Sequence, residues 1–302
     1  MSNLQQRKQQ MSVLDRLQRY LPQLVVVPPF LLIVFFVYGF IAWTGIISLT
    51  DSRMLPSFEV QGFQQYVRLF AMDRWDVAFH NLLIFGSLYI LFAITIGCVL
   101  AVLLDQRIRA EGALRTIYLY PMAVSFIVTG TAWKWILNPS LGIESYMQKL
   151  GWESFQFDWI VNRDMAIYVV VIAAVWQASG FVMALFLSAL RTVMKTSSAP
   201  PIWMVPAPRA SILHHSASLR PVFLSAFVIL AHLSIKSFDL VVALTNGGPG
   251  YSSTLPANFM YEMAFRRNQI GLGAASAMMM LATVAAIIVP YLYSELRAKR
   301  HG

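Results

Sequence analysis

Six long stretches without a charged side chain limit what this chain can fold into more than any other feature. They are Tyr20–Thr50, Val77–Leu104, Thr116–Trp133, Met165–Leu190, Pro221–Ile235 and Asn268–Ser294. A helix needs about 20 apolar residues to cross the hydrocarbon core of a bilayer, and each stretch reaches or approaches that length. Backbone polar groups cannot stay unpaired in lipid, so each stretch should be helical. The sequence therefore predicts an all-α membrane protein with six transmembrane helices.

The composition excludes a soluble globular protein, because 58% of the residues are hydrophobic, 12% are charged and the mean hydropathy is +0.61. The first uncharged stretch is about twice as long as the apolar part of a signal peptide, so it should span the membrane. We expect a tail and interfacial helix over 1–23, a first transmembrane helix over 24–50, a core domain over 77–294 with helices at 77–104, 116–137, 165–190, 220–245 and 270–294, and a tail over 295–302.

The distribution of lysine and arginine predicts the orientation in the membrane. Both tails together with the second and fourth connections hold fourteen of these residues, and the other three connections hold seven. Loops rich in Lys and Arg stay in the cytoplasm, so both termini should be cytoplasmic. The net charge of +9 then reflects topology and contact with anionic lipid, and nucleic-acid binding is not expected.

The predicted fifth helix carries the polar residues that are most costly in a membrane. His232, Lys236 and Asp239 follow at spacings of four and three, which places them on one face of a continuous helix. A charge at a membrane helix centre costs about 2.5–3.5 kcal/mol on insertion scales, so these groups should face protein or water and pair. They could line a substrate path, or they could form a structural ion pair near the outer end of the helix.

Two tryptophans and a glutamine in other predicted helices are further candidates for a substrate path. Trp176 and Gln177 lie in the middle of the fourth helix, and Trp133 lies near the end of the third. An aromatic face stacks on a pyranose and an amide bonds its hydroxyls, so this pairing suits a sugar. Trp133 could equally be an anchor at the membrane interface.

The sequence offers no catalytic site, no cofactor site and no metal site. The loop G-x-x-x-x-G-K-[ST] is absent, so nucleotide binding by that route is not possible. His214 and His215 are adjacent and have no nearby Cys, Asp or Glu to complete a metal site. Cys98 is the single cysteine and lies within an apolar stretch, where packing is its expected role.

Several segments resemble the permease subunits of binding-protein-dependent ABC importers of the sugar type. The segments that carry the resemblance are 115–121, 133–139, 174–181, 219–221, 236–239, 245–250 and 290–297. The last of them, Pro290-Tyr291-Leu292-Tyr293-Ser294-Glu295-Leu296-Arg297, is similar to the importers of glucose and mannose in particular. The resemblance covers nearly the whole chain.

The resemblance implies a type-1 importer fold and a passive subunit that forms half of a translocation path. Its expected partners are a second permease subunit in a heterodimer, two cytoplasmic ATPase subunits and a periplasmic sugar-binding protein. The expected location is the bacterial inner membrane. The motif Thr-x-Gly-Gly-Pro of the family falls on Thr245, Gly247, Gly248 and Pro249, where it implies a turn that faces the binding protein. The turn could also simply end a helix.

The fourth connection departs from the family. Where the family has a Glu-Ala-Ala-x-x-x-Gly helix that docks the ATPase, this chain has a basic segment with prolines at 200, 201, 206 and 208. A proline inside a helix costs about 3 kcal/mol, so this segment as written cannot form the coupling helix. The positions expected to couple to the ATPase are Met194, Lys195, Ala199, Trp203, Met204 and Val205.

A shift of the reading frame is one explanation of this departure, and true divergence of the segment, with loss of the coupling element, is the other. We read the codons of this segment in the frame that starts at the last base of the Val193 codon. In that frame three residues follow whichever synonymous codons the gene uses: Glu from the bases of Met194-Lys195, Asp from those of Trp203-Met204 and Gly from those of Met204-Val205. These residues fit the family motif. We hypothesise that roughly residues 194–218 are a frame-shifted segment between two compensating errors. Resequencing this part of the gene tests the hypothesis, and an unchanged sequence contradicts it.

A transporter or channel that needs no ATPase is the alternative from another class. An intact coupling motif, or co-purification with a subunit that hydrolyses ATP, separates the two hypotheses.

Overall fold

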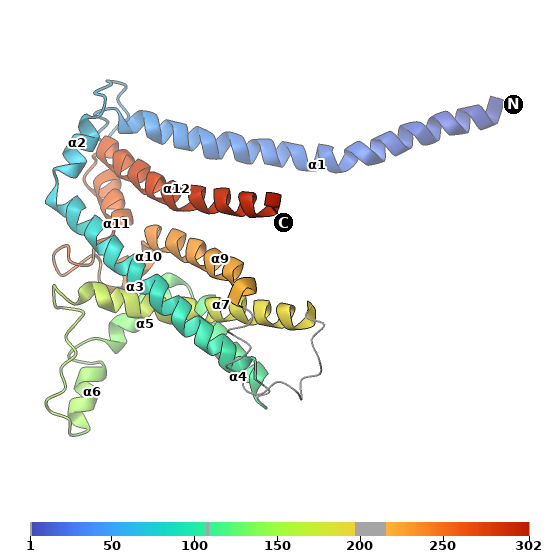
Figure 1. Cartoon of the computed structure of the whole chain (residues 1–302). Coiled ribbons are helices and arrows are strands. Elements are labelled where there is room, and N and C mark those ends of the chain that lie inside the picture. The colour runs from blue at the N-terminus through green and yellow to red at the C-terminus, as the bar shows by residue number, and fades with distance from the viewer. Residues whose placement is uncertain (1, 107–108, 197–215, 302) are drawn as a thin grey trace.

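The computed structural model describes residues 2–106, 109–196 and 216–301, and these are almost entirely helical (Figure 1). The helices are α1 (Ser2–Ser48), α2 (Gln64–Phe70), α3 (Asp73–Leu104), α4 (Glu111–Ala123), α5 (Phe126–Ile136), α6 (Ile143–Lys149), α7 (Ala166–Thr196), α9 (Ser216–Ile235), α10 (Asp239–Leu244), α11 (Pro256–Tyr261), the π-helical η2 (Glu262–Arg266) and α12 (Ile270–His301). One isolated antiparallel bridge joins Thr50 to Val60. The all-α prediction is confirmed.

Four helical segments of the described chain are long and apolar enough to cross a membrane: Val25–Ser48, Asp73–Leu104, Ala166–Thr192 and Ile270–Tyr293. The bent pair α4–α5 makes a fifth if it is counted as one span. The apolar part of α9, Leu219–Ile235, is shorter. The count of six spans and the cytoplasmic position of both termini therefore stay predictions.

The helix predicted over 116–137 is broken in two. α4 ends at Ala123 and α5 begins at Phe126, with an angle of 100° between them. Val124 has an extended backbone, and the hydroxyl of Ser125 caps α5 by accepting a hydrogen bond from the backbone N–H of Val128 at 3.3 Å. A serine in this position starts a new helix, because its side chain satisfies a backbone N–H that has no partner within the helix.

The helix predicted over 220–245 is interrupted as well. α9 ends at Ile235 and α10 starts at Asp239, whose carboxylate lies in the first turn of α10. A negative charge is favourable there because it faces the positive end of the helix dipole. His232, Lys236 and Asp239 therefore do not share one face of a continuous helix, and that prediction is wrong.

The N-terminal segments predicted as separate elements form one helix. α1 runs from Ser2 to Ser48, bends along its length and projects from the bundle (Figure 1). None of the apolar window of its candidate span is buried within this chain. Burial begins at the last turn, at Ile47 and Ser48.

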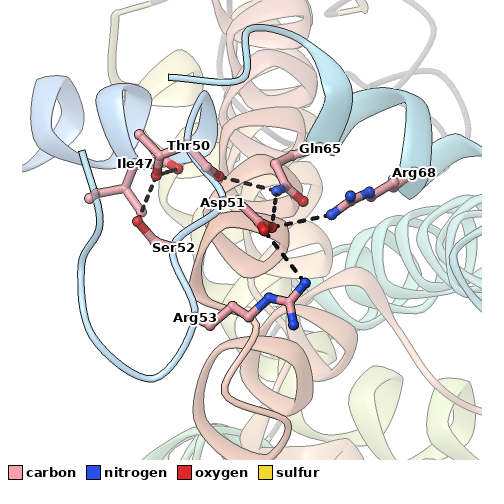
Figure 2. A network of polar contacts seen from close by, with 7 residues as sticks. All are labelled: Ile47, Thr50, Asp51, Ser52, Arg53, Gln65 and Arg68. Atoms are coloured by element: carbon pink, nitrogen blue, oxygen red, sulfur yellow. Dashed lines mark hydrogen bonds and ion pairs between the residues drawn. The ribbon is translucent and has the colours of Figure 1, made fainter. Parts of the chain in front are cut away.

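A polar cluster fixes the end of α1 to α2 and α12 (Figure 2). The Gln65 amide donates to the Thr50 carbonyl oxygen and to the Asp51 carboxylate, each at 3.1 Å, and the Ser52 carbonyl oxygen accepts from the Gly271 N–H at 2.8 Å. Burial by itself would raise the pKa of the Asp51 carboxyl. The Gln65 hydrogen bond and the nearby charges of Arg53 and Arg68 outweigh that effect and hold the pKa below its usual value.

The core of the bundle is the packed pair α3 and α7, with α4 and α9 against it. Small residues let these helices approach closely. A Cβ at Gly97 of α3 would overlap the side chain of Val182, and a Cβ at Gly180 of α7 would overlap the backbone carbonyl of Tyr118 in α4. Close helix contact through small residues is a principal means of packing in membranes, where lipid is as apolar as the side chains.

Gly180→Ala should destabilise the protein by about 1–3 kcal/mol, because the backbone of α4 must move away to make room for the methyl group. The measurement is the thermal unfolding midpoint of the detergent-solubilised protein. Gly39→Ala is the matched control, since no atom lies within 4 Å of the position its Cβ would take. An equal midpoint for the two variants would contradict the close approach of α4 and α7.

Candidate functional site

A central cavity of about 240 Å³ lies where the two interrupted helices meet the core. Its lining residues are Phe85, Tyr89, Phe126, Ala174, Leu233, Lys236, Ser237, Phe238, Asp239 and Leu240. Phe126 is the first residue of α5 after the first break, and residues 236–238 form the second break, with Asp239 at the start of α10. Because of the two breaks, the start of α5 and the start of α10 line the central cavity.

Lys236 and Asp239 both line the central cavity. They do not form an ion pair with each other, and neither takes part in the ion pairs found among the described residues. His232 is exposed and is not among the described residues that line this cavity. Of the three polar residues that were expected on one helix face, only Lys236 and Asp239 line this cavity, and they lie at the break between α9 and α10.

Trp133 and Trp176 lie together at a second, larger cavity of about 860 Å³. Their rings meet edge to face with centroids 6.0 Å apart. The remaining lining residues come mostly from α3 and α7 and are almost all apolar: Leu88, Phe92, Ile96, Trp159, Met165, Tyr168, Val171, Ile172, Val175 and Ser179. The structure thus separates the two tryptophans from the two charges.

Gln177 supports the first break and lines neither cavity among the residues described for each. Its side-chain nitrogen Nε2 donates to the carbonyl oxygen of Val124 at 2.7 Å. Val124 is the C-cap residue that directly follows α4, so this bond satisfies a carbonyl at the broken end of that helix. The side chain is buried, and its Oε1 has no hydrogen-bond partner in the described structure.

The segment from Thr245 to Gly250 forms a tight turn. Asn246, Gly247 and Gly250 have positive φ angles of 52°, 80° and 66°, and the bond between Gly248 and Pro249 is cis. Glycine adopts positive φ without the clash that a Cβ causes, which accounts for Gly247 and Gly250 in this motif.

Side-chain hydroxyls hold the turn closed. Thr245 Oγ1 and Ser253 Oγ are 2.7 Å apart, and Ser253 Oγ donates to the Gly248 carbonyl oxygen at 2.8 Å. Thr254 Oγ1 donates to the Gly247 carbonyl oxygen at 3.1 Å. The turn is therefore an ordered structure with internal hydrogen bonds, which goes beyond a simple helix stop.

Asn81 of α3 was missed in the sequence and fastens the turn to the core. Its side-chain nitrogen Nδ2 lies 3.0 Å from the carbonyl oxygens of Ser252 and Thr254 and 3.5 Å from that of Tyr251. The signal was available, because Asn81 is the one amide side chain in the uncharged stretch 77–104. A buried amide in such a stretch indicates a backbone segment without partners of its own.

A charged cluster lies beside the turn and was also missed. Arg74 of α3 binds the carboxylate of Glu262 through both of its terminal nitrogens, and Arg267 Nε lies 3.0 Å from Glu262 Oε1. The Arg74 guanidinium also lies over the Tyr251 ring, 4.1 Å from its centroid. These groups line a cavity of about 380 Å³, named the mouth cavity, together with Phe238, Val242, Asn246, Gly247, Gly250, Thr254, Asn258, Tyr261 and Arg266.

The residues expected to contact the ATPase fall at the edge of the described chain. Met194 and Lys195 lie in the last turn of α7. Ala199, Trp203, Met204 and Val205 lie outside the described residues. In the part of the chain that the structure describes, no group of three or more His, Cys, Asp and Glu side chains could hold a metal ion.

Comparison with known proteins identifies the family. A probable ABC transporter permease protein of Pyrococcus horikoshii is 34% identical to this chain over 278 residues, which cover 89% of this chain and 94% of that protein. The chain belongs to the ABC transporter permease family. This permease is also 29% identical over 272 residues to the xylose/arabinose import permease protein of Haloferax volcanii, covering 88% of this chain and 85% of that one.

The fold of this permease agrees with the assignment. The crystal structure of a bacterial alginate ABC transporter in complex with an alginate pentasaccharide-bound periplasmic protein contains a chain that matches it with a TM-score of 0.74 at 16% identity, over 94% of this chain and 97% of that chain. No protein-family model matches the sequence. Permease subunits of ABC transporters are non-catalytic multi-pass membrane proteins, and their ATPase is a separate subunit. Membership of this family therefore favours an ATP-driven importer over an ATPase-independent transporter.

Asn81→Leu should loosen the turn, because the carbonyl oxygens of Tyr251, Ser252 and Thr254 lose their donor. An unsatisfied buried polar group costs about 1–3 kcal/mol. Hydrogen–deuterium exchange of the purified permease should become faster over residues 245–255 while α7 stays unchanged. Ser87→Ala, on the same helix, removes only a hydroxyl bonded to Ile84 within that helix, and serves as the control. Unchanged exchange in the turn would show that Asn81 does not hold it.

Proposed function

We propose that this permease is the membrane subunit of a binding-protein-dependent ABC sugar importer and forms half of its translocation path. Relatives that support the substrate class include the xylose/arabinose import permease and the trehalose/maltose transport permease MalF of Thermococcus litoralis. The alginate transporter with its sugar-loaded periplasmic protein supports the mode of delivery. The similarity of residues 290–297 to glucose and mannose importers makes a hexose the first substrate to test.

The proposed assembly is a heterodimer of this chain with a second permease, two cytoplasmic ATPases and a periplasmic binding protein. In this proposal the chain crosses a bacterial inner membrane six times, and both of its termini lie in the cytoplasm. The end of the bundle where α2 and α11 gather then faces outward (Figure 1). The turn at Thr245, Gly247, Gly248 and Pro249 lies between α10 and α11, which suits the proposed contact with the binding protein.

The observation that carries the proposed path is the central cavity between two broken helices. Irregular backbone at membrane depth is tolerated where it lines a cavity, because water or substrate can satisfy the exposed polar groups. Broken helices mark substrate sites in several transporter folds for the same reason. We assign Lys236 and Asp239 to this path, where their charges can bond sugar hydroxyls and water.

The other expected path residues take different proposed roles. Trp133 and Trp176 line the larger apolar cavity, where an aromatic pair could receive the apolar face of a sugar ring during passage. Gln177 acts on the path indirectly, by holding the break through Val124. His232 lies one turn before the second break and keeps only a peripheral place in the proposed path.

The connection over residues 194–218 is the proposed ATPase-coupling element. α7, which packs against both α3 and α4, leads directly into it. Movement of the ATPases would therefore reach the core through α7. The frame-shift hypothesis applies to this segment: the gene product that couples to the ATPases should carry the family motif in place of the prolines.

Lys236→Met and Asp239→Asn should each lower kcat/KM for sugar uptake about 10- to 100-fold, because a hydrogen bond to a charged group contributes about 1.5–3 kcal/mol. The assay is ATP-driven uptake of labelled glucose, mannose, xylose and maltose by proteoliposomes that contain the assembled transporter and its binding protein.

Lys134→Met is the matched control, since Lys134 lies in the last turn of α5 and is not among the residues that line the central cavity. It should leave uptake within about twofold of the wild-type rate. Uptake of none of the four sugars by a transporter whose residues 194–218 carry the family motif would refute the proposed function. Uptake that is unaffected by both cavity variants would refute the assignment of the path.

A further inference from the structure

The mouth cavity is a built polar site that the proposed path does not use. It lies between the start of α3, the turn and η2, and its volume of about 380 Å³ is in the range of small-molecule pockets. Within the cavity, the carboxylate of Glu262 forms ion pairs with both Arg74 and Arg267. Such bidentate arginine–carboxylate contacts are among the strongest and most directional in proteins. The charged groups are therefore held in place before any ligand arrives.

Two aromatic rings of this cavity remain available to a ligand. Tyr251 is 46% exposed and Tyr261 is 41% exposed. Arg74 covers one face of the Tyr251 ring, which fixes the orientation of that ring. The Tyr261 ring is held from two sides by Phe238 and Phe265, with centroids 4.9 and 5.3 Å away. Fixed, half-exposed rings with hydroxyl groups offer both an apolar face and a polar edge.

The cavity also holds polar groups without a partner. The Arg74 Nε atom is buried and has no hydrogen-bond partner in the described structure. The side chains of Asn246 and Arg266 line the cavity as well and add an amide and a third guanidinium. Arg74 therefore keeps one N–H donor beyond the two terminal nitrogens that bind Glu262.

We propose that the mouth cavity is a second sugar subsite, occupied as the sugar leaves the binding protein and before it reaches Lys236 and Asp239. The inference rests on the proposed function and deepens it. Aromatic faces can stack on the C–H face of a pyranose, while the amide and guanidinium groups can bond its hydroxyls. The turn forms one wall of the cavity, so the subsite lies next to the proposed contact with the binding protein.

The arrangement favours a sugar over an acidic side chain of the binding protein. The Glu262 carboxylate already occupies the strongest cationic position, between Arg74 and Arg267. A polyhydroxylated neutral ligand offers both donors and acceptors to the amide, hydroxyl and guanidinium groups of the cavity. The aromatic rings would contribute little to a carboxylate.

The test measures equilibrium binding of radiolabelled glucose, mannose, xylose and maltose to the assembled transporter in nanodiscs, without binding protein. Tyr251→Leu should weaken the outer subsite about 2- to 12-fold, because stacking on an aromatic ring contributes about 0.5–1.5 kcal/mol. The dissociation constant of that subsite, obtained from the full binding curve, should rise by this factor. Tyr251→Phe keeps the ring and should retain the wild-type dissociation constant.

Phe70→Leu is the control, since Phe70 is an exposed ring on α2 and is not among the residues lining the mouth cavity. Equal binding by the wild-type and Tyr251→Leu transporters, with wild-type uptake intact, overturns the subsite alone. A Tyr251→Leu transporter that binds sugar normally but has a weaker affinity for the binding protein would instead assign the cavity to protein docking. A transporter that takes up none of the four sugars overturns the proposed function itself.

Discussion

The requirement that buried backbone groups find partners in an apolar bilayer governs the rest of this structure. A continuous helix meets it alone, but α4–α5 and α9–α10 are interrupted, and each interruption exposes carbonyl and amide groups. At the first break, the Ser125 hydroxyl accepts from an amide of α5 and the Gln177 amide donates to the Val124 carbonyl oxygen. Ser125 lies in the break itself and Gln177 lies in α7, so the first break depends on the packing of α4 against α7.

The same requirement links the core to the Thr-x-Gly-Gly-Pro turn. Asn81 of α3 donates to the carbonyl oxygens of Ser252 and Thr254, which follow the Thr-x-Gly-Gly-Pro turn. Arg74, at the start of the same helix, forms an ion pair with Glu262 and lies over the Tyr251 ring. One helix thus holds the turn, the mouth cavity and one side of the central cavity. In the proposed function a sugar would meet the mouth cavity and then the central cavity along α3, with Phe238 lining both cavities.

The sequence predicts the helices well because an uncharged run of about 20 residues has few alternatives to a helix in lipid. It does not predict the breaks, because a single serine such as Ser125 also occurs inside helices, and the spacing of Lys236 and Asp239 fits one face of a continuous helix. The role of Gln177 depends on a contact 53 residues away, and that of Asn81 on contacts more than 170 residues away. The tryptophans and the charges were grouped by chemistry, but the fold places them at different cavities.

The central claim is that a sugar passes the cavity between the two broken helices. Ser237 lines that cavity, and Cys98 is the only native cysteine, so Ser237→Cys in a Cys98→Ala background gives one reactive position. The measurement is the rate of its modification by a membrane-impermeant thiol reagent in proteoliposomes of the assembled transporter. The account predicts modification that is slowed by the sugar the transporter takes up. A position that does not react, or one whose rate the sugar leaves unchanged, would contradict it.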